Sequence, residues 1–211
     1  MPNKMMEMLK KHIKENLAVY FIVVLCFLIG VSVGAFTVKA VDPHQKQELV
    51  SYLKGFFQLF NEDQLEPMGI FRESIKNNTQ LIVFNWILGL VVIAAPVVLV
   101  VIGFKGFVIG FTVGLLLEEF KVFGVLLFLL GVLPHNIIII PTFIFGAVLS
   151  VTFAMMVLKA KINKVRNFSY GKQMMIYSGI HMGILMVLLV ASTLESFVIP
   201  FFIKVVVRFM G

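Results

Sequence analysis

The sequence predicts an all-α, polytopic integral membrane helix bundle. Of its 211 residues, 60% are hydrophobic and only 14% are charged, whereas a soluble domain carries about 25% charged residues. Several long segments contain no Asp, Glu, Lys or Arg, and a helix needs about 20 mostly apolar residues to cross a bilayer. Because no hydrophilic segment is large enough for a second folded unit, we expect residues 1–211 to form a single membrane domain.

The charge-free runs locate the expected crossings. The first run follows Glu15 and is longer than the apolar part of a signal peptide, so it is expected to be an uncleaved anchor helix. The long third run contains Pro134 and Pro141, and a proline inside a helical pattern ends or kinks it. Five crossings are predicted, and a sixth over residues 196–209 is the alternative. The long runs are 16–38, 77–104, 122–158 and 173–194, and the shorter ones are 106–117 and 196–203.

The net charge of +7 indicates the orientation, since basic residues concentrate in short cytoplasmic loops. Residues 1–16 hold four lysines and two glutamates, which gives +2, and are predicted to form a cytoplasmic basic amphipathic segment. Residues 159–172 hold five basic residues and no acid, which gives +5, and are predicted to be a cytoplasmic basic loop. Residues 39–80 hold five basic and six acidic residues, which gives −1, and are predicted to lie outside as an amphipathic loop.

This orientation requires one outward crossing between Lys105 and His135 and a return over residues 137–158. Glu118 and Glu119 then fall near the middle of the outward crossing. Because a charge at the bilayer centre costs about 2.5 kcal/mol or more, we expect a broken or re-entrant segment near residues 105–136.

Four intramembrane polar residues are candidates for function. Glu118 and Glu119 could belong to an ion pathway or to a charge pair within the bundle. His135 and Asn136 follow Pro134, where they could satisfy backbone groups that the proline frees. A single histidine with no Cys, Asp or second His nearby is poor evidence for a metal ligand, so the structural role is favoured.

Glycines four residues apart predict smooth helix faces that allow close packing. Such a face could pack inside the same bundle, which is the favoured interpretation, or against a second protein, including a second copy in a homodimer. The helix-packing candidates are Gly30 and Gly34, then Gly106, Gly110 and Gly114, then Gly179 and Gly183.

An amphipathic helix is expected within the outer loop. Its apolar residues recur every three to four positions, which is typical of a helix with one apolar face. That face could lie on the outer leaflet or bind an extracytoplasmic partner. The tentative partner-binding residues are Leu49, Leu53, Phe56, Phe57 and Phe60.

The sequence offers no set of residues typical of an enzyme or a cofactor site. It lacks a Ser/His/Asp set, paired catalytic carboxylates and a Gly-rich phosphate loop. Its one cysteine, Cys26, excludes a CxxC-type site. We therefore expect no catalysis, cofactor or metal. Anionic lipid accounts for the basic loop without nucleic acid.

An ordered set of motifs resembles a known family. The motifs are FRESIKNN at 71–78, WILG at 86–89, KGFVIGFTVG at 105–114, LPHN at 133–136, and Pro141. Together they are similar to the stage II sporulation protein M family over nearly the whole chain.

This resemblance implies a function that composition does not. Members of the family act in endospore formation, when the mother-cell membrane engulfs the forespore. The resemblance implies a membrane scaffold that recruits and anchors two peptidoglycan hydrolases at the septum, the stage II sporulation proteins D and P. The alternative from the residues alone is a small transporter or channel that uses Glu118, Glu119 and the broken helix at Pro134, since broken helices build substrate sites in transporters.

Overall fold

The described part of the chain is helical and contains no strand. The structure is a computed structural model, and it describes residues 2–61, 67–91, 95–164 and 169–208, without the side chains of residues 2–6, 8, 9 and 59–61. The elements in chain order are α1 (Pro2–Glu15), α2 (Leu17–Ala40), α3 (Pro43–Asn61), α4 (Pro67–Leu90), α5 (Ala95–Leu127), the π-helical η2 (Phe128–Val132), α6 (Leu133–Ile162), α7 (Tyr170–Thr193), the π-helical η3 (Leu194–Val198) and α8 (Ile199–Arg208).

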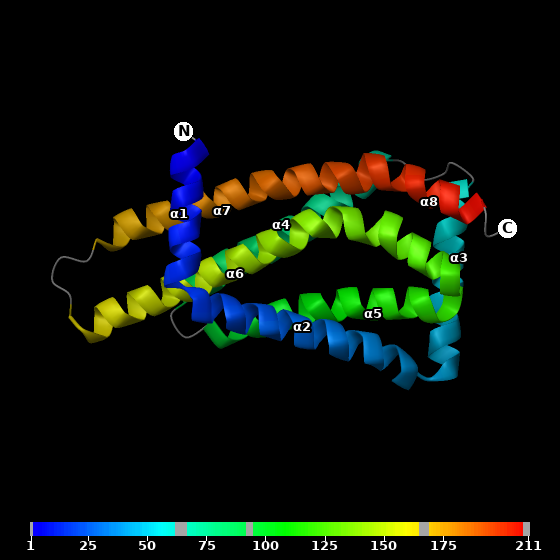
Figure 1. The fold of residues 1–211 in the computed structure, drawn as a ribbon, viewed down its shortest axis with the longest axis horizontal. Coiled ribbons are helices and arrows are strands. Elements are labelled where there is room, and N and C mark those ends of the chain that lie inside the picture. Colours follow the sequence, from blue (N-terminus) through cyan, green and yellow to red (C-terminus); the bar gives the residue numbers. More distant parts are fainter. Residues whose placement is uncertain (1, 62–66, 92–94, 165–168, 209–211) are drawn as a thin grey trace.

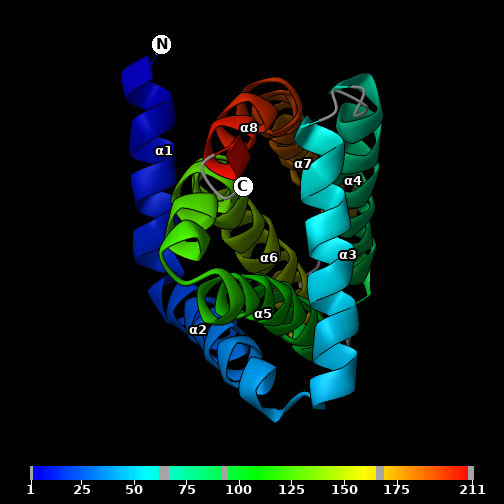
Figure 2. The same cartoon turned by 90° about the vertical axis from the view of Figure 1, so that its right-hand side faces the viewer.

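The long helices lie roughly side by side, and two amphipathic helices lie across them. Figure 1 shows α1 crossing the bundle near one end and α3 crossing it at the other. Helix α6 contacts α2, α4, α5 and α7, so it is the central element. Figure 2, which looks onto the end covered by α3, shows α2 and α5 as neighbours below α6.

Three continuous helical stretches are long and apolar enough to cross a membrane: Leu17–Ala40, Ala95–Ile162 and Tyr170–Arg208. Large apolar side chains also cover their outer faces, as Phe36 (71% exposed) does on α2 and Met175 (77% exposed) on α7. Such faces are expected where hydrocarbon replaces water as the solvent. The predicted all-helical membrane class is therefore supported.

Helices α2 and α5 run parallel and approach each other closely along their glycines. A Cβ added at Gly30 would lie 2.0 Å from the carbonyl oxygen of Gly103, and one added at Gly106 would lie 2.3 Å from that of Phe27. Since no side chain fits at such distances, the glycines allow direct backbone contact between the two helices.

The second apolar run, 77–104, does not form one helix. Helix α4 ends at Leu90 and α5 begins at Ala95, with Pro96 in its first turn. Proline is well tolerated in the first turn of a helix but cannot continue the preceding one. The expectation that the run 77–104 forms one crossing is wrong, because Pro96 can begin a helix but cannot continue the preceding one.

The region 105–136 contains a helical hairpin. Lys121 has φ 50°, outside helical values, and divides α5. A Cβ at Gly124 would lie 2.0 Å from the carbonyl oxygen of Leu116, so the chain folds back tightly on itself. Glu118 and Glu119 therefore lie at the tip of this hairpin, which fits the expected break in the segment 105–136.

The prolines of the long third run bend a helix that continues. Pro134 occupies the first turn of α6, directly after the π-helical segment η2, and Pro141 lies inside α6. The short apolar tail likewise continues α7 through η3 into α8, in one direction along the bundle (Figure 1). The expected loop 39–80 contains α3 and the first part of α4.

Candidate functional site

A polar pocket of about 250 Å³ lies between α4, α5, α6 and η3. Lys105, the first of the α5 residues that line it, is ten residues from Ala95, which is about 15 Å along the helix axis. The pocket is therefore near mid-length of the α5 rod. Its polar lining residues are Ser74, Asn77, Asn78, Lys105, Thr112, His135, Asn136 and Glu195, and its apolar ones are Val108, Ile109, Val132 and Ile139.

Hydrogen bonds fix one wall of this pocket. Glu195 accepts a hydrogen bond of 2.5 Å from the Ser74 hydroxyl, which also lies 2.9 Å from the Ser192 hydroxyl. The amide of Asn78 lies 3.4 Å from each serine oxygen. Ser74, Asn78 and Ser192 are all buried. This network links α4 to the junction of α7 and η3, and it holds the Glu195 carboxylate in place.

Lys105 brings a positive charge to the same pocket. Its ammonium lies 5.5 Å from the centre of the Phe143 ring, a distance compatible with a cation–π contact. It belongs to none of the ion pairs found among the described residues. A lysine in the middle of a membrane costs about 2.5–3.5 kcal/mol and is by default a candidate for function.

His135 is the third titratable side chain of the pocket. Its Nε2 lies 3.0 Å from the amide nitrogen of Asn136, which itself donates to the carbonyl oxygen of Val132 over 2.7 Å. Its Nδ1 is buried and has no hydrogen-bond partner among the described residues. A buried polar atom without a partner is costly, and such atoms often mark sites that bind water or a ligand.

Both π-helical segments border this pocket. Val132 ends η2, and Glu195 lies in η3. A π-helical turn inserts one residue into a helix and turns the residues that follow, and such turns are frequent at functional sites. Here η3 contains Glu195, and η2 ends shortly before His135 and Asn136 in the first turn of α6. The two π-helical turns therefore lie next to the polar residues that meet in the pocket.

Glu118 and Glu119 lie six and seven residues beyond the pocket-lining Thr112 on α5, do not line the pocket, and form ion pairs with α3. The Lys46 ammonium is 2.5 Å from Glu118 and 3.0 Å from Glu119. Hydrogen bonds to Glu118 and then Glu119 raise the pKa of Lys46. These two glutamates therefore attach α3 to the hairpin tip, while His135 and Asn136 contribute to the pocket.

The apolar face of α3 packs inside the molecule. Phe57 is buried against Leu116 and Val206, and its ring lies 5.7 Å from that of Phe120. Leu53 and Phe56 pack on the same cluster. This differs from the expectation of a face open to lipid or a partner, because α8 and the hairpin provide an apolar surface that the local sequence could not reveal. Leu49 is exposed, and the Phe60 side chain lies outside the described residues.

The predicted glycine faces divide into two groups. Gly30 and Gly34 on α2 face the backbone of Gly103 and Phe107 on α5. Gly106, Gly110 and Gly114 on α5 face the backbone of Phe27, Val31 and Ala35 on α2, so all five lie at the contact between these two helices. Gly179 and Gly183 on α7 face open space, since no described atom beyond the helix's own backbone lies within 4 Å of an added Cβ. Gly179 and Gly183 therefore do not serve helix packing within the described part of the chain. A contact with a second copy of the protein at these two glycines stays a prediction.

Sequence reasoning did not find Lys105 and Glu195. In the sequence, Lys105 separates the runs 77–104 and 106–117, and Glu195 separates the runs 173–194 and 196–203. One signal was available, since each is a single charge between two apolar runs that continue as one helix. A charge in that position lies inside the membrane-spanning part of the helix. It is therefore expected to face the interior of the bundle and not lipid. No group of three or more metal-ligating side chains occurs in the described part of the chain.

These features define a class of protein: an integral membrane helix bundle with a polar pocket between its helices. The sequence matches the family Stage II sporulation protein M over residues 23–200, so the chain belongs to that family and is a sporulation-related membrane protein. No curated protein and no solved structure matches the chain.

Proposed function

We propose that this protein is a non-enzymatic scaffold that recruits and anchors extracytoplasmic peptidoglycan hydrolases at the septal membrane of the mother cell during engulfment. The observation that carries this proposal is membership of the stage II sporulation protein M family over residues 23–200. The partners proposed from that membership are the stage II sporulation proteins D and P.

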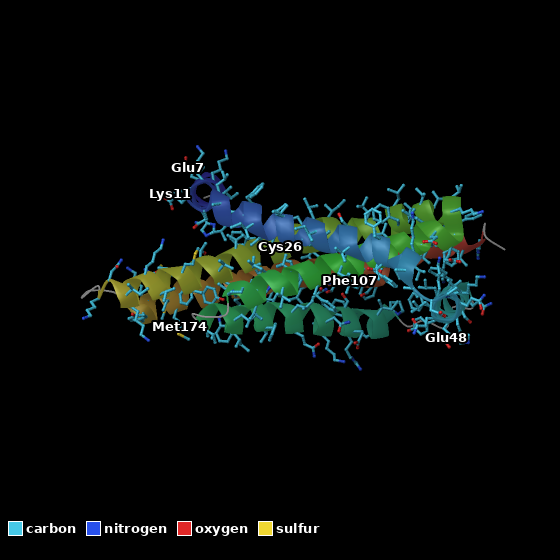
Figure 3. The ribbon with its side chains drawn as sticks, turned by 90° about the horizontal axis from the view of Figure 1, so that it is seen from below. Glu7, Lys11, Cys26, Glu48, Phe107 and Met174 are labelled. Atoms are coloured by element: carbon cyan, nitrogen blue, oxygen red, sulfur yellow. The ribbon has the colours of Figure 1, made fainter. Side chains whose placement is uncertain are left out.

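The proposal needs one end of the bundle outside the cytoplasm. Helices α2, α4, α5, α6 and α7 with α8 would give five crossings, with the N-terminus inside and the C-terminus outside. The basic helix α1, the end of α6 and the start of α7 lie toward one end, and α3 lies at the other (Figure 1). Lys11 on α1 and Glu48 on α3 mark these two regions in Figure 3. This separation supports an outer position for α3.

The outward face of α3 is the proposed binding surface, because its opposite face is used internally. Tyr52 is 75% exposed, and Leu49 lies one turn before it at 38% exposure. An exposed tyrosine is a common anchor in protein interfaces. The proposed surface therefore centres on Tyr52 and Leu49 in place of Leu53, Phe56 and Phe57.

Deleting the gene in sporulating cells should block engulfment and disperse the two hydrolases from the septum. In complemented cells, Tyr52→Ala should reduce co-purification of the hydrolases while membrane levels stay normal. Ile162→Ala is the matched control, since Ile162 is similarly exposed, at 68%, on the other end of the bundle. Normal engulfment and septal hydrolases in the deletion strain would overturn the proposal.

Transport is the second candidate function, and the polar pocket is the observation that favours it. The residues that would carry it are Lys105, His135 and Glu195, because Glu118 and Glu119 pair with Lys46 elsewhere. Purified protein in vesicles should then pass protons or a small solute, and Glu195→Gln should reduce the flux. Vesicles that stay impermeable across a solute panel would exclude this function.

A further inference from the structure

A groove of about 640 Å³ adjoins the polar pocket on the side of α4 and α5. Asn77, Lys105 and Val108 line both spaces, so the groove leads directly to the charged pocket. Its other lining residues are Gln80, Leu81, Phe84 and Phe104. A mostly apolar groove on the surface of the bundle therefore ends at a lysine that forms no ion pair among the described residues.

The exposure of the groove's aromatic residues indicates what can enter it. Phe104 is 65% exposed and Phe84 is 46% exposed. In a membrane protein, these exposed rings face lipid, and they line the same groove as Lys105. Hydrocarbon chains can pack against them, whereas a water-soluble solute gains nothing from such contacts.

The pocket beyond the groove contains one charge of each sign, and these charges are not paired with each other. Lys105 stands over the Phe143 ring, and Glu195 is held by the Ser74 hydroxyl. No ion pair joins them among the described residues. A ligand with a single negative charge would leave Glu195 without an ionic partner, and a cation would leave Lys105 without one. A head group with both charges can pair its negative group with Lys105 and its positive group with Glu195.

We propose that the groove and pocket together bind one zwitterionic phospholipid of the phosphatidylethanolamine type. The phosphate is placed at Lys105 and the side-chain amide of Asn77, and the ammonium group at Glu195. The buried Nδ1 of His135 is a further hydrogen-bonding atom in the pocket. The acyl chains lie along Leu81, Phe84 and Phe104. This binding is independent of hydrolase recruitment.

The test is native mass spectrometry of the full-length protein in a mild detergent, with added phosphatidylethanolamine or phosphatidylglycerol. We expect one phosphatidylethanolamine to be retained in preference to phosphatidylglycerol. Lys105→Gln and Glu195→Gln should each weaken its retention about tenfold, as expected for the loss of one charge-assisted hydrogen bond. Lys39→Gln is the matched control, because Lys39 is an exposed lysine at the end of α2, and should have no effect.

A second measurement uses the wild-type chain and does not depend on the folding of variants. Phosphatidylethanolamine with a photoreactive head group should cross-link to peptides containing Asn77, Lys105 or Glu195. Free phosphoethanolamine at the same concentration should not compete, because the groove supplies part of the affinity. Equal retention of both lipids, unchanged retention in both pocket variants, or cross-links spread over the lipid-facing helices would show unselective surface lipid and overturn the proposal. Competition by free phosphoethanolamine would identify a soluble ligand instead.

Discussion

Gly110 of α5 lies directly against the backbone carbonyl oxygen of Val31 in α2. A Cβ added at Gly110 would be 2.0 Å from that oxygen and 2.8 Å from the Cα of Val31. The two helices are parallel and meet in the same way at Gly34, where an added Cβ would lie 2.1 Å from the oxygen of Phe107. Contact between backbones therefore determines the spacing of α2 and α5.

Replacing Gly110 by alanine should separate these helices. Because the opposing atoms belong to the backbone, no flexible side chain can move aside, and we expect a loss of about 1–3 kcal/mol in the free energy of unfolding. Gly183→Ala is the matched control, since Gly183 faces open space on α7. Denaturant or thermal unfolding in detergent measures both. Equal stability of the two variants would contradict the close packing.

Replacing Phe57 should destabilise the protein before it affects any partner. Its ring is buried in a cluster with Leu116, Leu127 and Val206, and Phe→Ala in a core costs about 3–5 kcal/mol. Tyr52→Ala, on the exposed face of the same helix, should change the free energy of unfolding by less than about 0.5 kcal/mol. Unfolding of both variants in detergent tests this. A Phe57→Ala protein with unaltered stability and lost hydrolase binding would restore the partner interpretation of this face.

Reversing the charge of Lys46 should loosen α3 from the hairpin tip. Lys46→Glu would place an acid beside Glu118 and Glu119, and the resulting repulsion would favour detachment. We expect a cysteine at position 53, in a Cys26→Ala background, to react several-fold faster with a thiol reagent. Adding Glu118→Lys to the Lys46→Glu variant should slow this reaction again. Failure of the second change to reverse the first would show that the ion pairs do not attach α3.

Acidification should weaken the docking of α1. His12 lies 3.3 Å from the hydroxyl of Tyr20 and edge-on to the Phe145 ring. Burial lowers the pKa of His12 from its usual 6.5, and the nearby Glu15 opposes this shift. The docked state therefore binds protons less well than the undocked one, so its stability is full above about pH 6.5 and falls as the pH drops below that value.

A spin label on a cysteine at position 7, which is exposed on α1, can measure this docking. Its mobility should rise between pH 7.5 and pH 5.5 in a Cys26→Ala background that is otherwise wild type. The His12→Phe variant keeps an aromatic ring at the contact but cannot take up a proton, so its label should respond little to pH. The same pH dependence in both proteins would assign the effect to another group.

Several features of this protein follow from its sequence alone. The scarcity of charge predicts helices in a membrane, and the basic segments 1–16 and 159–172 predict which ends face the cytoplasm. The spacing of Gly106, Gly110 and Gly114 predicts a close helix contact. The apolar helices and the close glycine contact are found in the structure, because composition and helical periodicity are local properties of the chain. The orientation stays a prediction.

The partners of these features depend on the tertiary structure. Only the fold shows that α2 meets the glycines of α5 and that α8 covers Phe57. The backbone also decides where helices begin and where they are divided, as at Pro96 and Lys121. The turn at Lys121 is the reason why Glu118 and Glu119 lie at a hairpin tip. The polar pocket joins Ser74, Lys105, His135 and Glu195 from four separate segments. No local pattern records such a meeting, because it results from helices packing across large distances in sequence.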